Sequence, residues 1–593
     1  MLQFSFPIAI GRTGIIGVLI CLLQPISNSG IAEANSSPIA QQSQVTPARF
    51  NLGEATIADL QTALKIKQIT CEQLTAAYLE RIKRYNLTVR TAPPLNAIVA
   101  LNPAAVDAAR ALDRYFEQTG QWVGPLHCIP TVVKDNIDTE EMTTSAGSFA
   151  LLGTQASHDA FLVKQLRQAG AIILAKTGMD EFASGLFGIS SRSGRIGNAY
   201  NSWKNPGGSS GGSAVAVSAN FAVIGIGTDN SGSIRVPAAF NGLVGLRPST
   251  GLVSQGGIFP AGNLDGVAGP MARTVTDLAQ ALDIMAQPDP NDPKTQSVPR
   301  QGSYRSYLKP QGLQGKRIGV VRQVGDVANQ ITERKPWQGM PQDIQKIFRQ
   351  AEQVMQKGGA EFVDIKLPGF NSDRLSNMAG MKADIDAYLS AFPAARRNFQ
   401  DICTSKRTHQ YGDESACLRF VASLPPQGGA AEQAALQIFA ANKRYVETLM
   451  DKQKLDALLL PISTTGSATD DPEKINTWSS PISSNAGLPS LVITAGYDAG
   501  GMPVGMELVS RQFAEGTLLE MAYAYEQQMP QRRSPKLEPE ERLTTLAIAE
   551  FNNLVTLLGV TSYEEVLSQT NPQSLTAVRF KDIAQRIISP RRK

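Results

Sequence analysis

The stretch GGSSGGSAVAVSANFAVIGIGTDNSGSIRVPAAF, residues 207–240, decides the fold of this chain. Gly and Ser fill its first seven positions, SAVAVSAN follows, and the apolar run FAVIGIGT then predicts a buried strand. A polar loop after this strand leads into IRVPAAF, where we expect a helix. A strand that is apolar along its whole length is typical of a sheet that is covered on both faces.

The same alternation of helices and short apolar strands continues on both sides of this stretch. Upstream, LHCIPTVVKD predicts a buried strand that ends at Lys134, FLVKQLRQAG a helix, and AIILAKT another strand. Downstream, RIGVVRQ and EFVDIKLP predict strands on either side of a helix near residues 342–357, and residues 370–440 are more helical. We therefore predict an α/β fold with a mixed central β-sheet that helices cover on both faces.

The N-terminal segment has the pattern of a signal peptide over residues 1–34. Arg12 precedes an apolar run from Gly14 to Leu23, and Ala32-Glu33-Ala34 has the small-x-small form of a cleavage site. The run is too short to cross a bilayer, which takes about 20 residues. We expect cleavage, a periplasmic or secreted protein, and no stable membrane insertion afterwards. An uncleaved anchor and an early start codon are the alternatives.

Changes in composition divide the rest of the chain. Residues 35–48 are polar and aperiodic, which predicts a linker, and the main domain then spans residues 49–533. Helical patterns with one apolar side predict a C-terminal extension over residues 534–593. This extension either packs on the main domain as a strut or contacts a partner.

The cysteines after residue 34 are few. They are Cys71, Cys128, Cys403 and Cys417, and none has the CxxC spacing of a zinc site. Cys403 and Cys417 are close enough in the sequence to form a disulfide in an oxidising compartment. The alternative is that all four are packed thiols.

Charge and missing motifs exclude several classes of function. The formal net charge of +4 is spread along the chain, so we expect no nucleic-acid partner. The three histidines, His127, His158 and His409, lie in neither a nucleophile elbow nor a metal motif, and HExxH and a phosphate-binding loop are absent. His127 is expected in an apolar strand with a structural role. A serine nucleophile here would need a lysine base, whose pKa must fall from about 10.4 to about 7.

Three stretches carry groups that suit such chemistry. They are TVVKDN with Lys134, GGSSGGSAV with Ser209 and Ser210, and TDNSGSIR with Ser233. The last stretch lies between a predicted strand and a predicted helix, so its backbone amides would lie at a helix N-terminus, where they are natural donors to an oxyanion. These amides belong to Asn230, Ser231, Gly232 and Ser233.

The three stretches resemble the signature of the amidase signature family, and the resemblance covers roughly residues 51–533. GPMARTVTD, NAGLPSLVITAG and GGMPVGMELV are also similar to that family. The resemblance implies the amidase signature fold and a triad in which Ser233 is the nucleophile, Ser209 the bridging serine in a cis peptide, and Lys134 the base. It implies neither a metal nor an organic cofactor.

Several side chains near Ser233 have roles that the motifs alone do not decide. Where the family shows Thr-Gly-Gly-Ser, this chain has Asn230-Ser231-Gly232-Ser233, and the side chain at position 231 is expected to narrow the acyl side of the pocket. Asp229 and Arg235 either pair to fix the loop or form a surface ion pair. Ser210 is expected to form hydrogen bonds within the Gly/Ser loop.

We therefore predict an exported amidase that hydrolyses a carboxylic or peptide C-terminal amide to an acid and ammonia or an amine, through a serine acyl-enzyme. The expected partner is a small-molecule or peptide amide substrate. One alternative is the amidase-like subunit of a tRNA-dependent amidotransferase, and another is a catalytically inactive binding protein. Segment 300–480 and the loop 253–263 are expected to form the pocket walls. The sequence leaves the individual substrate and the oligomeric state open.

Overall fold

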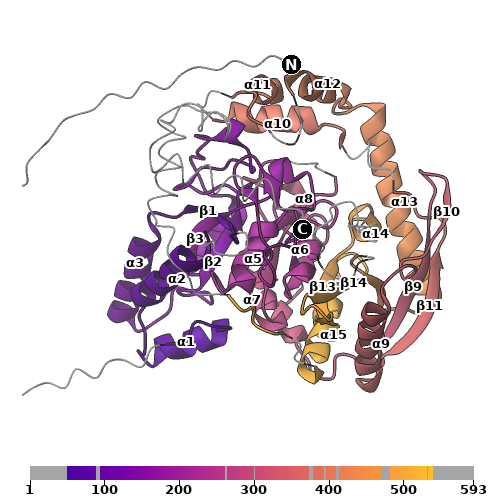
Figure 1. The fold of residues 1–593 in the computed structure, drawn as a ribbon, viewed down its shortest axis with the longest axis horizontal. Coiled ribbons are helices and arrows are strands. Elements are labelled where there is room, and N and C mark those ends of the chain that lie inside the picture. Colours follow the sequence, from indigo (N-terminus) through magenta and orange to yellow (C-terminus); the bar gives the residue numbers. More distant parts are fainter. Residues whose placement is uncertain are drawn as a thin grey trace, which may run out of the picture. The chain divides into compact units, whose positions relative to one another are not determined.

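A mixed sheet of twelve strands organises the described part of the chain in the computed structural model (Figure 1). The structure describes residues 50–87, 94–260, 264–299, 301–372, 378–392, 396–408, 410, 413–463, 465, 468, 481–529 and 532–537. The predicted signal peptide, the predicted linker and residues 538–593 of the predicted C-terminal extension therefore lie outside the described residues.

Eleven of the strands form one continuous path, and β11 (Glu361–Leu367) pairs with β9 beside it. The path runs through β1 (Ile98–Leu101), β3 (Ile172–Thr177), β2 (Pro130–Lys134), β6 (Ile224–Asp229), β8 (Val267–Ala272), β7 (Val244–Arg247), β13 (Ser490–Tyr497), β14 (Pro503–Val509), β12 (Ala457–Pro461), β9 (Arg317–Asp326) and β10 (Ile331–Arg334). A separate two-stranded sheet pairs β4 (Ile189–Ser190) with β5 (Gly194–Arg195).

Helices lie along the whole sheet, with α2 and α3 at the β1 end and α9 and α13 at the β9 end (Figure 1). The α-helices are α1 (Ile57–Lys65), α2 (Cys71–Tyr85), α3 (Ala105–Thr119), α4 (Phe161–Gln168), α5 (Gly211–Ser218), α6 (Arg235–Phe240), α7 (Val275–Met285), α8 (Pro293–Gln296), α9 (Gln342–Lys357), α10 (Met381–Ser390), α11 (Phe399–Thr404), α12 (Glu414–Ser423), α13 (Ala430–Lys452), α14 (Pro481–Ser484) and α15 (Glu515–Gln528). Short 3-10 turns are η1 (Phe149–Leu151), η2 (Glu181–Ala183) and η3 (Tyr304–Tyr307).

Both faces of the sheet are buried, as the apolar strands predict. Successive side chains of a strand point to opposite faces. On β13, Leu491 and Ile493 belong to the main core together with Phe348 of α9, whereas Val492 packs in a separate cluster with Phe240 of α6. The predicted α/β class with a mixed sheet and helices on both faces is confirmed.

The strands that carry the predicted site lie side by side and parallel. Val132 of β2 is opposite Gly225 of β6, and both strands run in the same direction. Their carboxyl ends therefore meet at one edge of the sheet, where ligands bind in open α/β sheets. This register brings the end of β2 at Lys134 close to the end of β6.

The prediction for the residues before β2 is wrong in part. The strand begins at Pro130, and His127 lies in a turn rather than in a strand. Cys128 in this turn has a φ of 65°, which belongs to the left-handed region and cannot continue a strand. An apolar composition alone does not reveal such a turn.

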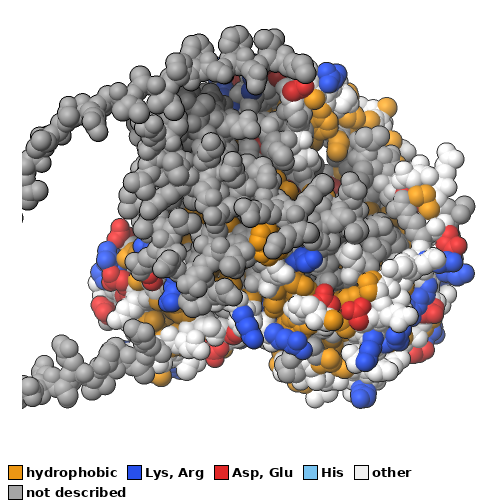
Figure 2. Space-filling view, in the orientation of Figure 1, with side chains coloured by type: hydrophobic (Ala, Val, Ile, Leu, Met, Phe, Trp, Pro, Cys, Tyr) orange, Lys and Arg blue, Asp and Glu red, His pale blue; other side chains and the backbone are white. Residues whose placement is uncertain are grey.

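Charges of both signs lie close together on the surface. On the face drawn in Figure 2, Lys and Arg side chains alternate with Asp and Glu along the lower rim. Among the described residues, none of the helices combines the length and the apolar character that crossing a membrane requires.

Candidate active site

Lys134 is the last residue of β2, and its side chain is fully buried. Its Nζ lies 2.7 Å from Ser209 Oγ and 2.8 Å from Thr228 Oγ1, and it also reaches the Thr228 carbonyl oxygen at 3.4 Å. Two of the three residues of the predicted triad are thus in direct contact, although 75 positions separate them in the sequence.

Burial gives this lysine an unusual charge state. Removal from water lowers the pKa of Lys134 to about 7, against the opposing attraction of Asp180 and Asp229. In a large fraction of the molecules, Lys134 is therefore neutral at neutral pH. A neutral amine has two N–H groups and one lone pair. If the N–H groups donate to the two oxygens of Thr228, the lone pair is left to accept the Ser209 hydroxyl proton.

The turn that holds Ser209 is shaped by Gly208 and Asp180. The Gly208–Ser209 peptide bond is cis, as the family resemblance implies. The Asp180 amide donates to the Ser209 carbonyl oxygen at 3.2 Å. The Asp180 carboxylate accepts the amides of Phe187 and Gly188 at 3.1 and 2.9 Å, so it connects the turn to a neighbouring loop.

Gly208 has no room for a side chain, and we expect Gly208→Ala to disrupt this turn. An added Cβ would collide with the Asp180 carboxylate and would lie 2.9 Å from the Phe187 amide nitrogen. Crowding of this kind should lower the free energy of unfolding by about 1–3 kcal/mol and should also reduce amide hydrolysis. Urea titration and ammonia release check both effects. Gly302→Ala is the matched control, because nothing lies within 4 Å of its Cβ position; equal behaviour of the two variants would contradict the expectation.

Ser210 differs from its predicted role. Its Oγ donates to the Thr228 carbonyl oxygen at 3.1 Å and accepts the Thr228 amide at 3.2 Å, so its partner is on β6 and not in the Gly/Ser loop. This approach requires Gly227, where a Cβ would lie 2.7 Å from Ser210 Oγ. The Ser210 amide also donates to the Ser233 carbonyl oxygen at 3.1 Å. The Gly/Ser turn is thereby joined to the loop of the predicted nucleophile.

Ser233 lies in the loop between β6 and α6 and is buried. The preceding Asp229 folds this loop around its carboxylate, which accepts the Gly232 amide at 2.7 Å and the Ile234 amide at 3.0 Å. The structure therefore differs from the prediction at Gly232, because that N–H donates to Asp229 and not toward a substrate. For Asn230, Ser231 and Ser233, the role as oxyanion donors stays a prediction.

Asp229 and Arg235 form a buried ion pair, so the surface alternative is wrong. Arg235 Nε lies 3.0 Å from Asp229 Oδ2, and neither side chain is exposed. Burial by itself raises the pKa of Asp229, but Arg235 and Arg247 outweigh it and hold that pKa well below its ordinary value. Arg235 also contacts Glu507 and donates to Ser483 Oγ at 2.8 Å. The carboxylate thus stays charged and holds the loop of the predicted nucleophile in place.

Thr228 is the first residue of the stretch TDNSGSIR, but that motif alone gives its side chain no role in the site. Its Oγ1 accepts the Asn136 side-chain amide at 3.1 Å in addition to Lys134. The signals in the sequence are its place in this motif and its position at the end of the apolar strand, next to Asp229. Neither signal indicates that its hydroxyl contacts Lys134.

We expect Thr228→Val to lower kcat about 10- to 100-fold, because it leaves two buried donors, on Lys134 and Asn136, without their acceptor. Thr228→Ser keeps the hydroxyl and should retain most of the rate. Steady-state ammonia release checks both variants, and a fully active valine variant would exclude a role for this hydroxyl.

One group of side chains away from this site has the donors of a metal centre. The Sγ atoms of Cys71 and Cys128 and a ring nitrogen of His127 lie within 4.8 Å of one another. The two sulfur atoms are bonded to each other as a disulfide, so neither is a thiolate that could bind a metal. The spacing of the cysteines does not predict this bond. The Cys403–Cys417 disulfide, one of the two alternatives for that pair, is also present.

Comparisons with known proteins place these features in context. Residues 73–519 match the family model described as Amidase. The chain is 31% identical over 528 residues to a probable amidase of Arabidopsis thaliana, covering 85% of this chain and 96% of that protein. It is also 33% identical over 503 residues to a glutamyl-tRNA(Gln) amidotransferase subunit of Moorella thermoacetica, covering 81% of this chain and 98% of that protein.

Solved structures give the same result. The native peptide amidase of Stenotrophomonas maltophilia superposes with a TM-score of 0.73 and is 35% identical, with 82% of this chain and 99% of that chain covered. The peptide amidase PAM, solved with the competitive inhibitor chymostatin, has a TM-score of 0.73 and is 34% identical, with 82% and 99% covered.

Proposed function

The chain belongs to the amidase family and is a serine amidase that hydrolyses C–N bonds, and from this premise we propose that it is an exported peptide amidase. In this proposal, Lys134, Ser209 and Ser233 release ammonia from the C-terminal amide of a peptide. The contact of 2.7 Å between Lys134 Nζ and Ser209 Oγ, in a buried site, carries the proposal.

The proposed mechanism begins with proton transfer. Neutral Lys134 takes the proton of the Ser209 hydroxyl, and Ser209 in turn takes the proton of the Ser233 hydroxyl. Ser233 Oγ then attacks the amide carbonyl carbon and forms a tetrahedral intermediate, whose oxyanion is stabilised by backbone amides of the nucleophile loop. Collapse of the intermediate breaks the C–N bond, and Ser209 returns a proton to the leaving ammonia.

Water completes the reaction in the same way. Water attacks the acyl carbon as it gives a proton through Ser209 to Lys134. The bond between the acyl carbon and Ser233 Oγ then breaks, Ser233 Oγ takes the proton back through Ser209, and the acid leaves. Burial of the site supports this assignment, because a lysine that was fully solvated would remain protonated at neutral pH. The ion pair of Asp229 with Arg235 supports it by holding the loop rigid during both steps.

The choice of substrate rests on the similar peptide amidases. The purified protein should release ammonia faster from a C-terminally amidated dipeptide than from an aliphatic amide or an aryl amide. Ser233→Ala provides the background rate. Faster release from aliphatic or aryl amides would overturn the peptide-amide assignment and leave the amidase assignment intact.

Export is proposed from the N-terminal pattern and from the cysteines. All four cysteines after residue 34 are paired, as Cys71–Cys128 and Cys403–Cys417. Structural disulfides persist in oxidising compartments and are rare in the cytosol. Cell fractionation with mass spectrometry of the purified protein should find a chain that begins after residue 34 outside the cytosol. A full-length cytosolic chain with free thiols would contradict the proposal.

The similarity to the glutamyl-tRNA(Gln) amidotransferase subunit supports a second candidate function. In that role, the protein would release ammonia from the side-chain amide of glutamine for transfer. Free glutamine therefore belongs in the substrate screen. Hydrolysis of glutamine together with failure on every peptide amide would favour this second candidate.

A further inference from the structure

Helices α10, α11 and α12 form a small cluster, called here the helical cap, with an apolar core of its own. Residues of all three helices share this core with residues of the loops around the active site. The shared residues include Ile385 of α10, Ile402 of α11 and Val421 of α12, together with Phe182 and Phe259 of those loops. The cap is thus packed directly on backbone segments that support the triad.

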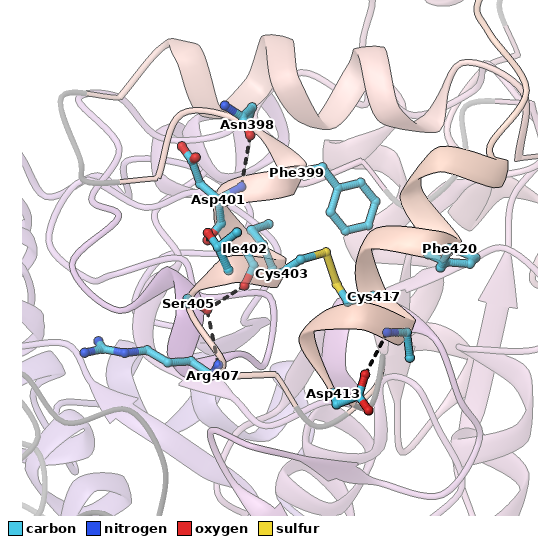
Figure 3. The surroundings of a disulfide bond; sticks show 12 residues. Asn398, Phe399, Asp401, Ile402, Cys403, Ser405, Arg407, Asp413, Cys417 and Phe420 are labelled. Carbon is cyan, nitrogen blue, oxygen red and sulfur yellow. Dashed lines mark hydrogen bonds between the residues drawn. A yellow bond between two sulfur atoms is a disulfide. The ribbon is translucent and has the colours of Figure 1, made fainter.

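A disulfide fastens the cap internally. Cys403 on α11 is bonded to Cys417 on α12, with both cysteines buried (Figure 3). The rings of Phe399 and Phe420 both lie near this bond and contact each other edge to face, with their centroids 6.3 Å apart. The two cysteines are 14 positions apart in the sequence. The bond between them therefore holds two short helices together, in addition to the packing of their side chains.

The first contact of the cap reaches the loop that follows Lys134. Tyr388 on α10 donates its hydroxyl to Asp138 Oδ1 at 2.6 Å. Burial and the neighbouring Asp138 raise the pKa of Tyr388 well above its ordinary value, so the phenol remains a donor. Asp138 is two residues after Asn136, whose side chain binds Thr228, the hydrogen-bond partner of Lys134.

The second contact reaches the turn that supports Ser209. Phe182 has a φ of 54°, which is strained for a bulky side chain and persists only where the surroundings impose it. Its ring packs in the core of the cap and lies 5.9 Å from the ring of Phe259. Two residues earlier, the Asp180 amide donates to the Ser209 carbonyl oxygen.

A polar contact supports the same turn. The Gln410 amide, between α11 and α12, donates to Glu181 Oε2 at 2.6 Å. Phe259 itself lies in the predicted wall loop 253–263, and its ring lies 5.3 Å from that of Tyr388. The cap therefore contacts one segment that leads to the lysine and another that leads to the bridging serine.

We propose that the helical cap is a positioning element for amide hydrolysis, in which Tyr388, Phe182 and the Cys403–Cys417 disulfide hold the Lys134 and Ser209 segments in their reactive arrangement. The inference rests on the proposed function of the triad. Tyr388 and Phe182 are positioning residues, since they act through Asp138 and Asp180 and touch no reacting atom. Small displacements in such a site cost much of the rate.

Tyr388→Phe removes only the hydroxyl that binds Asp138 and is the central test. We expect kcat to fall about tenfold, with KM changed by less than about twofold. The acidic limb of the pH profile should also move to higher pH, because a looser loop admits water and lowers the desolvation of Lys134. The charged groups that act on this lysine, Asp180 and Asp229, remain in place. Tyr525→Phe is the matched control, because this buried hydroxyl donates to the Ala495 carbonyl on the far side of the sheet from α6.

Two further variants address packing and the disulfide. Phe182→Leu keeps an apolar side chain and should retain more activity than Phe182→Ala. The double variant Cys403→Ser with Cys417→Ser should show the same fall in kcat and the same shift of the pH limb as Tyr388→Phe. Thermal melts of every variant identify those that fail to fold, and Tyr388→Phe keeps the proposal testable if the others do.

The outcomes separate this inference from the proposed function. Any amide that the wild-type protein hydrolyses can be the substrate in this test. If the wild-type protein does not hydrolyse peptide amides, the variants are compared on another amide. A folded Tyr388→Phe variant with wild-type kcat and an unmoved pH limb would overturn the inference while the triad stands. Absence of hydrolysis for every amide, without covalent labelling of Ser233, would overturn the proposed function itself.

Discussion

Replacement of Ser233 by Ala is expected to lower kcat for amide hydrolysis by about 10⁴- to 10⁶-fold, because no acyl-enzyme can form. A fluorophosphonate probe, which reacts covalently with an activated serine, should label the wild-type protein and not this variant. The variant should fold normally, since the Ser233 backbone, whose carbonyl accepts the Ser210 amide, is unchanged. Mass spectrometry of the labelled protein and ammonia release provide the two readouts.

Ser231→Ala is the control that tests which serine of the loop is the nucleophile. Position 231 is two residues away, and alanine there retains the backbone amide and removes only the side chain that is expected to narrow the acyl side of the pocket. This variant should therefore still be labelled at Ser233. Labelling that disappears in Ser231→Ala and persists in Ser233→Ala would reverse the assignment.

The pH dependence of kcat/KM should follow the charge of Lys134. Burial lowers the pKa of this lysine to about 7, and only the neutral form accepts a proton from Ser209. Activity should therefore rise as the pH increases through about 7 and should be lost below it as the amine becomes protonated. The free energy of unfolding should also rise with pH above about 7. The unfolded chain binds the lysine proton more tightly than the folded chain does, so the destabilisation that a buried charged lysine causes is removed as the lysine loses its proton.

Lys134→Met should lower kcat by about 10²- to 10⁴-fold, since general base catalysis contributes about that much. It should also remove the limb of the pH profile near pH 7, where the wild-type activity rises. Lys134→Arg should be equally inactive, because arginine stays protonated. Lys176 is a useful comparison, as a second buried lysine whose pKa is lowered, to about 8. Its Nζ contacts the Ile137 carbonyl and Thr144 Oγ1, so Lys176→Met should keep the limb near 7. Loss of the limb in that variant and its survival in Lys134→Met would exclude Lys134 as the base.

Local patterns in the sequence predict much of the fold. The predicted helix near residues 342–357 is α9, and the capping residues Thr70 and Gln73 begin α2. Such elements depend on the spacing of apolar residues and on side chains that bond to the nearby backbone. The apolar pattern wrongly predicts a strand at His127. The left-handed turn at Cys128 interrupts the strand there, and no residue pattern in the sequence marks that turn.

Pairings over long distances could not be predicted in the same way. Cys71 and Cys128 are 57 residues apart and form a disulfide, and Tyr388 binds Asp138 across 250 residues. No local pattern in the sequence shows which of these distant segments lie next to each other. Their proximity follows from the order of strands in the sheet and from the packing of the helices on it.

The sequence by itself determined the class of fold, because the spacing of apolar residues is a local property, and its resemblance to the amidase signature family predicts Lys134, Ser209 and Ser233 as the triad. Only the tertiary structure decided what each group contacts. The carboxylate of Asp229 takes the Gly232 amide, Ser210 bonds to β6, and Thr228 faces Lys134. A hydrogen bond depends on distances of a few tenths of an ångström, and these are set by how distant segments pack and not by the order of residues along the chain.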